Sequence, residues 1–118
     1  MRALVSESTR IDRAIADGTL LAAPTLIAAE VANALVGYVR AGRMNTREAR
    51  SRLRDLLELP IELVPIEEVA EGALRLALAR NLSVYDAYYV DLAHTRRAVL
   101  LTADRALAAA YERSELVA

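Results

Sequence analysis

The sequence predicts a single α/β domain in which helices cover both faces of a parallel sheet. Three short apolar stretches, at 19–23, 61–64 and 98–102, have the length and composition of buried strands, and segments of helical periodicity separate them. Apolar strands joined by helices are typical of parallel sheets buried on both faces. A chain of 118 residues has room for one hydrophobic core. We therefore expect a three-layer α/β/α domain.

The chain is expected to open with a short helix, whereas most three-layer α/β domains open with a strand. Ser8 or Thr9 is in position to cap this helix, and Gly18 is in position to end it. The apolar run 19–23 then stops at Pro24, which is the profile of a buried strand followed by a turn.

Two helices are expected next, joined by a short loop. Thr25 is in position to cap the first, and Gly42 ends it. Asn45 or Thr46 caps the second, which Pro60 stops. The apolar stripe of the first helix consists of Leu26, Ile27, Val31, Ala34, Leu35 and Val39.

The second half repeats this alternation of strands and helices. A strand is expected over 61–64, where apolar residues flank Glu62, and a helix over 67–80 with Asn81 as its C-cap. Ser83 starts another helix, which runs to about Arg96. The last expected elements are a strand over 98–102, a helix that begins at Asp104 and an edge strand over 115–118.

Composition excludes several classes of protein. There is no cysteine, which excludes disulfides and thiolate metal sites. No apolar run approaches the roughly 20 residues of a membrane span, and no signal peptide is visible, so we expect a cytoplasmic protein. The net charge of −1 gives no overall attraction to nucleic acid, although all 15 basic residues are arginine.

Three acidic residues stand where they can converge on one edge of the sheet. Glu30 lies on or beside the apolar stripe of its helix, Asp86 at a helix start, and Asp104 directly after a strand. Open α/β sheets bind ligands at the carboxyl ends of their strands. Carboxylates without histidine or cysteine suit Mg²⁺ or Mn²⁺, and such a site can activate water against a phosphodiester.

Each of the three residues also has a structural interpretation. Ser83 and Asp86 form a variant of the capping box, in which Asp86 bonds back to the Ser83 amide. Asp104 can be the N-cap of the last helix, and Glu30 can pair with a nearby arginine. The functional interpretation therefore depends on whether the three residues meet.

Other polar and aromatic residues are weaker candidates. His94, the only histidine, is expected at the surface. Tyr85, Tyr88 and Tyr89 can stack on bases, but aromatics at helical spacing are more often core or dimer contacts. The arginines between Arg40 and Arg54 can follow an RNA backbone, or they can be the solvated face of an amphipathic helix.

Three motifs, in order and at matching spacing, resemble PIN-domain proteins of the VapC toxin type. They are Ala29-Glu30-Val31-Ala32-Asn33-Ala34-Leu35, Tyr85-Asp86-Ala87-Tyr88-Tyr89-Val90-Asp91-Leu92-Ala93 and Leu101-Thr102-Ala103-Asp104-Arg105-Ala106-Leu107. The resemblance implies an endoribonuclease that depends on Mg²⁺ or Mn²⁺, a cognate antitoxin and a homodimer. It implies that Glu30, Asp86 and Asp104 bind the metal and that Thr102 supports the site.

The start of the chain departs from this family. PIN domains open with a short apolar strand that ends in an aspartate, and this strand is the centre of the sheet. The segment Met1–Val5 instead aligns with the helix after that aspartate. We therefore expect residues 1–118 to form one PIN-like domain that lacks the usual first strand and the first acidic ligand.

Two other functions remain open. A catalytically degenerate PIN-like module would bind an antitoxin or a second copy of itself without cleaving RNA. A metal-dependent DNA nuclease would use the same acidic site on another substrate. An encoded strand upstream of Met1 would favour the active enzyme over the binding module.

Overall fold

The computed structural model describes residues 13, 15–102, 105–109 and 111–116. The proposed caps Ser8 and Thr9 lie outside these residues, but Gly18 has the left-handed backbone expected at the end of the first helix (φ +74°). The elements are β1 (Leu21–Pro24), α2 (Leu26–Arg40), α3 (Thr46–Glu58), β2 (Ile61–Val64), α4 (Ile66–Arg80), α5 (Val84–Thr95), β3 (Leu100–Thr102), α6 (Arg105–Ala109) and β4 (Ser114–Leu116).

The strands form parallel pairs, as the sequence predicts. β1 pairs with β2 in the register Leu21 to Ile61, and β3 pairs with β4 in the register Leu100 to Ser114. Among the described residues these are two separate two-stranded sheets, and β1 is not hydrogen-bonded to β3. The parallel α/β class is confirmed, but the expected single sheet is divided: the first two predicted strands pair with each other, and the third pairs with the last strand.

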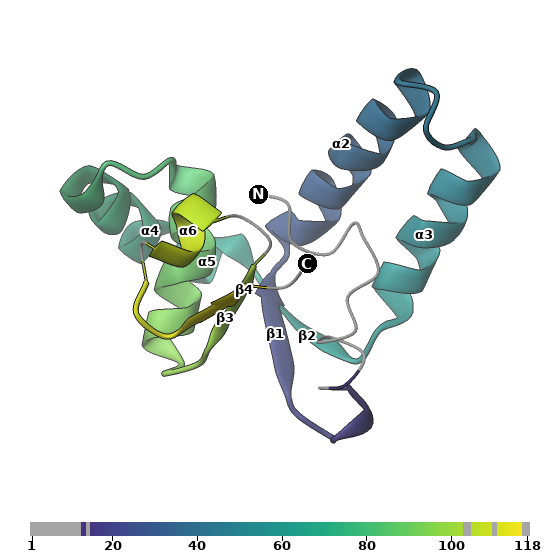
Figure 1. Ribbon diagram of the computed structural model, residues 1–118. Helices are drawn as coiled ribbons and strands as arrows, with labels where there is room; N and C mark the ends of the chain where they lie inside the picture. The colour runs from purple at the N-terminus through teal and green to yellow at the C-terminus, as the bar shows by residue number, and fades with distance from the viewer. Residues whose placement is uncertain (1–12, 14, 103–104, 110, 117–118) are drawn as a thin grey trace.

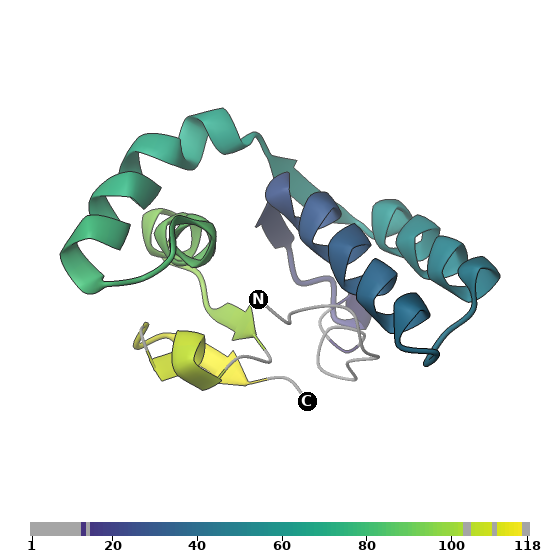
Figure 2. The same cartoon turned by 90° about the horizontal axis from the view of Figure 1, so that it is seen from above.

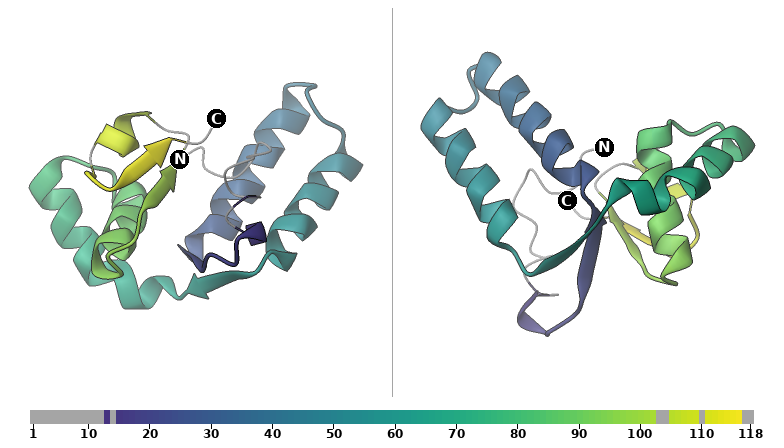
Figure 3. Two further views of the ribbon diagram at one scale, coloured as in Figure 1. Left: turned by 60° about the horizontal axis from the view of Figure 1, so that its bottom comes forward. Right: turned by 180° about the vertical axis from the view of Figure 1, so that it is seen from behind.

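The helices lie on the two sides of this division (Figure 1). The antiparallel hairpin of α2 and α3 extends to one side of β1 and β2, and α4, α5 and α6 lie on the other side with β3 and β4. Viewed from above, α2 and α3 run side by side, and α4 curves around α5, which is seen nearly end-on (Figure 2). In both views of Figure 3 the α2–α3 hairpin extends away from the strands. None of the described helices is long and apolar enough to cross a bilayer.

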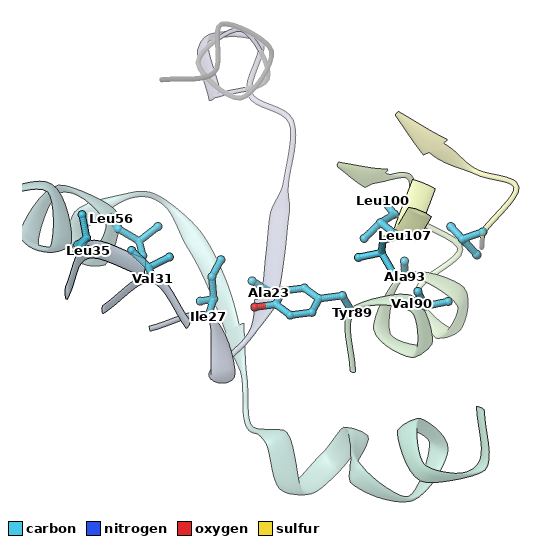
Figure 4. Close-up of a cluster of buried hydrophobic side chains, with 11 residues drawn as sticks. Ala23, Ile27, Val31, Leu35, Leu56, Tyr89, Val90, Ala93, Leu100 and Leu107 are labelled. Atoms are coloured by element: carbon cyan, nitrogen blue, oxygen red, sulfur yellow. The ribbon is translucent and has the colours of Figure 1, made fainter. Parts of the chain in front are cut away.

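One hydrophobic core connects the two sides (Figure 4). The hairpin contributes Ile27, Val31 and Leu35, whereas the other side contributes residues of α5, β3 and α6. Tyr89 extends from α5 toward β1 and thus bridges the division (Figure 4). From the sequence, the apolar residues Leu4, Ile11 and Leu35 of the first helices are expected to need cover from a partner. For Leu35 this expectation is wrong, because it packs with Leu56 of α3 and is only 4% exposed. Leu4 and Ile11 lie outside the described residues.

The helix ends show which of the predicted caps form. Asn45 Oδ1 accepts a hydrogen bond from the Glu48 amide at 2.8 Å, and Asn81 adopts the left-handed conformation of a C-cap (φ 53°). Thr25, in contrast, does not cap α2. Its hydroxyl accepts a hydrogen bond from the Ile66 amide at 3.3 Å, which ties the end of β1 to the start of α4.

Candidate active site

Glu30 lies in the second turn of α2, close to the end of β1. It is half-buried, because Ile27 and Val31 beside it on the helix belong to the core. A carboxylate in this position is costly to bury unless other groups compensate its charge. Glu30 does interact with other groups of the molecule.

Asp86 lies in the first turn of α5. Helix capping accounts for the hydrogen bond of its backbone amide but gives no role to its carboxylate. The Ser83 hydroxyl accepts a hydrogen bond from the Asp86 amide at 3.1 Å. The reciprocal bond of a capping box, from the Ser83 amide to the Asp86 carboxylate, is absent from the described part of the chain. The half-buried carboxylate of Asp86 is therefore available for another role.

Tyr89 shows that Glu30 and Asp86 converge. This side chain is 6% exposed, and burial is the main cause that raises the pKa of its phenol. Hydrogen bonding to Glu30 and the negative charges of Glu30 and Asp86 raise the pKa further. The contact with Glu30 is looser than a full hydrogen bond. Two carboxylates from two different helices thus act on one phenol oxygen.

The sequence does not predict this role of Tyr89, because aromatic residues at helical spacing indicate core or dimer contacts, or base stacking. Its position, three residues after Asp86, was the available signal, because residues three apart share one face of a helix. Core packing was correctly predicted for Tyr89. Tyr85, in contrast, is 58% exposed.

Thr102 and Asp104 belong to the end of β3. Thr102 is the last residue of this strand, is fully buried and interacts with other groups of the molecule. Asp104 lies outside the described residues, so neither its metal-binding role nor its capping role is tested. The described residues contain no cluster of three or more potential metal ligands, and Glu30 and Asp86 are two of the three that we predicted.

The remaining sequence candidates lie at the surface. His94 is exposed near the end of α5, as expected. The arginines from Arg40 to Arg54 are all exposed on the α2–α3 hairpin. Neither group reaches the acidic site through a hydrogen bond or ion pair of the described residues.

An apolar groove of about 450 Å³ lies between the two sheets. Its walls are the facing edges of β1 and β3, with the start of β2 and the side of α5. Tyr89 lines the groove and also contacts the acidic site, so the two features adjoin. The lining is mainly apolar, with Glu62 and Arg96 as its charged residues; these two form an ion pair at 2.6 Å.

Comparisons with known proteins find a matching family model and several related proteins. The model of the PIN domain family matches residues 4–113. Ribonuclease VapC3 of Pyrobaculum aerophilum is 38% identical over 103 residues, which cover 86% of this chain and 79% of the relative. Exonuclease VapC9 of the same organism is 35% identical over 109 residues, which cover 91% of this chain and 79% of the relative.

A relative from another organism and a solved structure are similar to this chain as well. Ribonuclease VapC3 of Mycobacterium tuberculosis is 34% identical over 93 residues, which cover 79% of this chain and 66% of the relative. The crystal structure of PAE2754 from Pyrobaculum aerophilum superimposes with a TM-score of 0.78 at 31% identity. This superposition covers 97% of the present chain and 78% of the solved one.

Proposed function

The chain belongs to the PIN-domain family, and on this premise we propose that it is a metal-dependent endoribonuclease, the toxin of a toxin–antitoxin pair. The observation that carries the proposal is the convergence of Glu30 and Asp86 on the Tyr89 hydroxyl. Structural capping or surface pairing alone would not bring carboxylates of α2 and α5 together. The names of two relatives, both called ribonuclease, support RNA as the substrate.

The donor set fits a hard divalent cation. Carboxylate and hydroxyl oxygens are ligands that Mg²⁺ and Mn²⁺ prefer. Glu30, Asp86 and Asp104 would hold the ion, and Thr102 at the end of β3 would support the site. When bound, such an ion polarises a phosphoryl oxygen and lowers the pKa of a bound water.

The protein's own contribution is to hold these carboxylates in place. The neutral phenol of Tyr89, whose pKa is raised by burial and by the nearby carboxylates, can donate toward Glu30. The phenol is fixed in turn by the core around Ala23 and Ile27 (Figure 4). A carboxylate restrained in this way is oriented before a metal or RNA arrives.

We further infer a cognate antitoxin, self-association as a homodimer and a cytoplasmic location. Support comes from apolar side chains that the single chain leaves exposed on α4, namely Leu74 and Leu78, and from Tyr85 on α5. These side chains are suited to a protein interface. A purified chain that sediments only as a monomer would contradict self-association.

Cleavage of a circular single-stranded RNA in the presence of Mn²⁺ tests the proposed activity. A circle has no ends, so its cleavage distinguishes an endonuclease from an exonuclease such as the name of VapC9 describes. We expect Asp86→Asn and Glu30→Gln each to reduce the cleavage rate at least about 100-fold, because loss of a residue that merely supports a metal ligand already costs 10–100-fold. Both variants should unfold at or above the parent's temperature, since each removes one of two neighbouring like charges.

Glu71→Gln is the matched control. Glu71 is exposed on α4 and pairs with Arg75 at 3.5 Å, so its loss should leave cleavage unchanged. Equal cleavage by the parent and both site variants would contradict the proposed site. A parent chain that cleaves neither RNA nor DNA yet binds an antitoxin would instead establish the degenerate binding module.

A further inference from the structure

The α2–α3 hairpin carries a set of exposed arginines. Arg40 and Arg43 lie at its tip, and Arg47, Arg50 and Arg54 follow along α3. The last three are spaced so that they share one face of the helix, opposite the side that packs on α2. We call these three residues the arginine stripe; it is about 10 Å long at the helical rise.

The side chains of the stripe form no ion pair with any described residue. The ion pairs that involve other arginines, Arg75 with Glu71 and Arg96 with Glu62, show that arginines of this chain do pair elsewhere. On α3 the nearest carboxylate at the start of the helix is already used, because Glu48 Oε1 accepts a hydrogen bond from Asn45 at 2.8 Å. Apart from the backbone hydrogen bonds of the helix, the described bond within the stripe joins Arg54 Nε to the Arg50 carbonyl at 3.5 Å.

The hairpin therefore has a charge opposite to that of the rest of the chain. Between residues 40 and 58 there are six arginines and three acidic residues, which gives a net charge of +3, whereas the whole chain has a net charge of −1. Two of the three acidic residues, Asp55 and Glu58, lie beyond the stripe in the last turn of α3. A solvated helix face that only maintains solubility would not need such a separation of charge.

The same hairpin also carries Glu30 of the acidic site. Ten residues of α2, or about 15 Å, separate Glu30 from Arg40 at the tip. A nucleic acid strand that leaves the acidic site along α2 would thus reach Arg40 at the tip within a few nucleotides, and from the tip the arginine stripe continues along the outer face of α3. Arginine binds phosphate with two parallel hydrogen bonds, which suits this role better than a diffuse charge.

We propose that the α2–α3 hairpin holds the sugar–phosphate backbone of single-stranded RNA through the arginine stripe, so that the strand extends from the acidic site along the hairpin. This inference rests on the proposed function for the identity of the nucleic acid. It adds a binding surface outside the site itself.

The test is the salt dependence of RNA binding. A fluorescein-labelled single-stranded RNA of about 20 nucleotides is titrated with the full chain in EDTA, and anisotropy is followed between about 50 and 200 mM salt. Each phosphate contact contributes about −0.7 to the slope of log K against log salt for single strands. The triple variant Arg47→Gln/Arg50→Gln/Arg54→Gln should therefore lose about 2 from this slope and bind at least tenfold more weakly at low salt.

Two further variants separate charge from structure. Replacing Arg75, Arg80 and Arg97 by glutamine removes three arginines outside the hairpin and should leave the slope unchanged. Replacing the stripe by three lysines keeps its charge and should keep the slope. Loss of the salt slope in the lysine variant as well, although its charge is unchanged, would attribute the effect to a damaged helix and would overturn the proposal.

The binding measurement is independent of catalysis, because EDTA removes the metal. If the parent does not cleave RNA but the stripe variant still lowers the salt slope, the RNA-binding surface is supported and the proposed ribonuclease activity is not. Unchanged RNA binding by the stripe variant would contradict the proposed RNA-binding surface even if cleavage is confirmed. Unchanged RNA binding together with lost binding of a polyglutamate peptide would show that the hairpin receives an acidic protein segment instead.

Discussion

At the scale of single residues, Tyr89 is the side chain on which the core and the acidic site depend together. Its ring packs with Ala23 and Ile27 across the division of the sheet (Figure 4), and its hydroxyl interacts with Glu30. Burial and two nearby negative charges all favour the neutral phenol. The consequence is a loss of stability at alkaline pH to which this one residue should contribute.

Tyr89→Phe should remove part of the loss of stability at alkaline pH. In an unfolded chain, tyrosine ionises at about pH 10. Above that pH the unfolded state loses the proton that folded Tyr89 retains, so the free energy of unfolding falls by about 1.4 kcal/mol per pH unit until the raised pKa of the folded state is reached. Urea unfolding between about pH 9 and pH 11 should show a shallower decline for Tyr89→Phe than for the parent.

Tyr85→Phe serves as the control for the alkaline effect. Tyr85 belongs to the same helix but is 58% exposed, and its variant should decline as the parent does. Parallel curves for the parent and Tyr89→Phe would mean that the Tyr89 proton is lost as easily in the folded state, and would remove the argument that its hydroxyl faces two carboxylates.

At the scale of helices and strands, most elements follow from local sequence. Asn45 and Asn81 act at the positions where capping rules place them, because both use interactions within a few residues. Thr25 has the same local signature but bonds to Ile66, 41 residues away. That partner depends on the parallel pairing of β1 and β2, which local patterns do not specify.

The contact between α4 and α5 is another feature that periodicity does not reveal. Gly72 lies opposite Asp91, and a methyl group added at Gly72 would come within 2.8 Å of Asp91 Cγ and would overlap its carboxylate. From the sequence alone, Gly72 is a residue of low helix propensity inside a helix. The structure shows that its lack of a side chain makes room for Asp91.

Gly72→Ala should therefore destabilise the protein. The displaced Asp91 carboxylate should cost about 1–3 kcal/mol, which exceeds the 0.5–1 kcal/mol that alanine contributes inside a helix. In an Asp91→Ala background the same substitution should instead stabilise by 0.5–1 kcal/mol, about the helix preference alone. Urea unfolding of the four proteins in this double-mutant cycle measures the change of sign. A stabilising Gly72→Ala in the parent would show that Asp91 moves aside without cost.

At the scale of the whole molecule, the PIN-like α/β class was predictable and the division of the sheet was only partly so. Motif spacing pointed to Glu30 and Asp86, and the structure brings both carboxylates near Tyr89, because each lies in the first two turns of its helix. The resemblance does not predict that, among the described residues, β1 and β3 remain apart with an apolar groove between them.

This groove has the features of a position for a strand. The facing edges of β1 and β3 have no strand between them in the described part of the chain, and buried backbone groups left unpaired cost about 1–3 kcal/mol each. The sum over two edges approaches the whole stability of a domain, about 5–15 kcal/mol. The aligned residues also span only 79% of VapC3 and 78% of the solved relative.

We expect the gene to encode, in frame before Met1, about five apolar residues followed by an aspartate and a small residue, which is the length of an ordinary strand. The free energy of unfolding, measured in urea, should be several kcal/mol higher for a chain extended by these residues than for the chain from Met1. The β1 and β3 amides of the extended chain should also exchange hydrogen more slowly, because both edges become paired. Sequencing upstream of the Met1 codon decides first: a stop codon or a polar stretch there would refute the encoded strand. If the strand is present, unchanged exchange at Leu21 to Ala23 and at Leu100 to Thr102 would show that it does not occupy the groove.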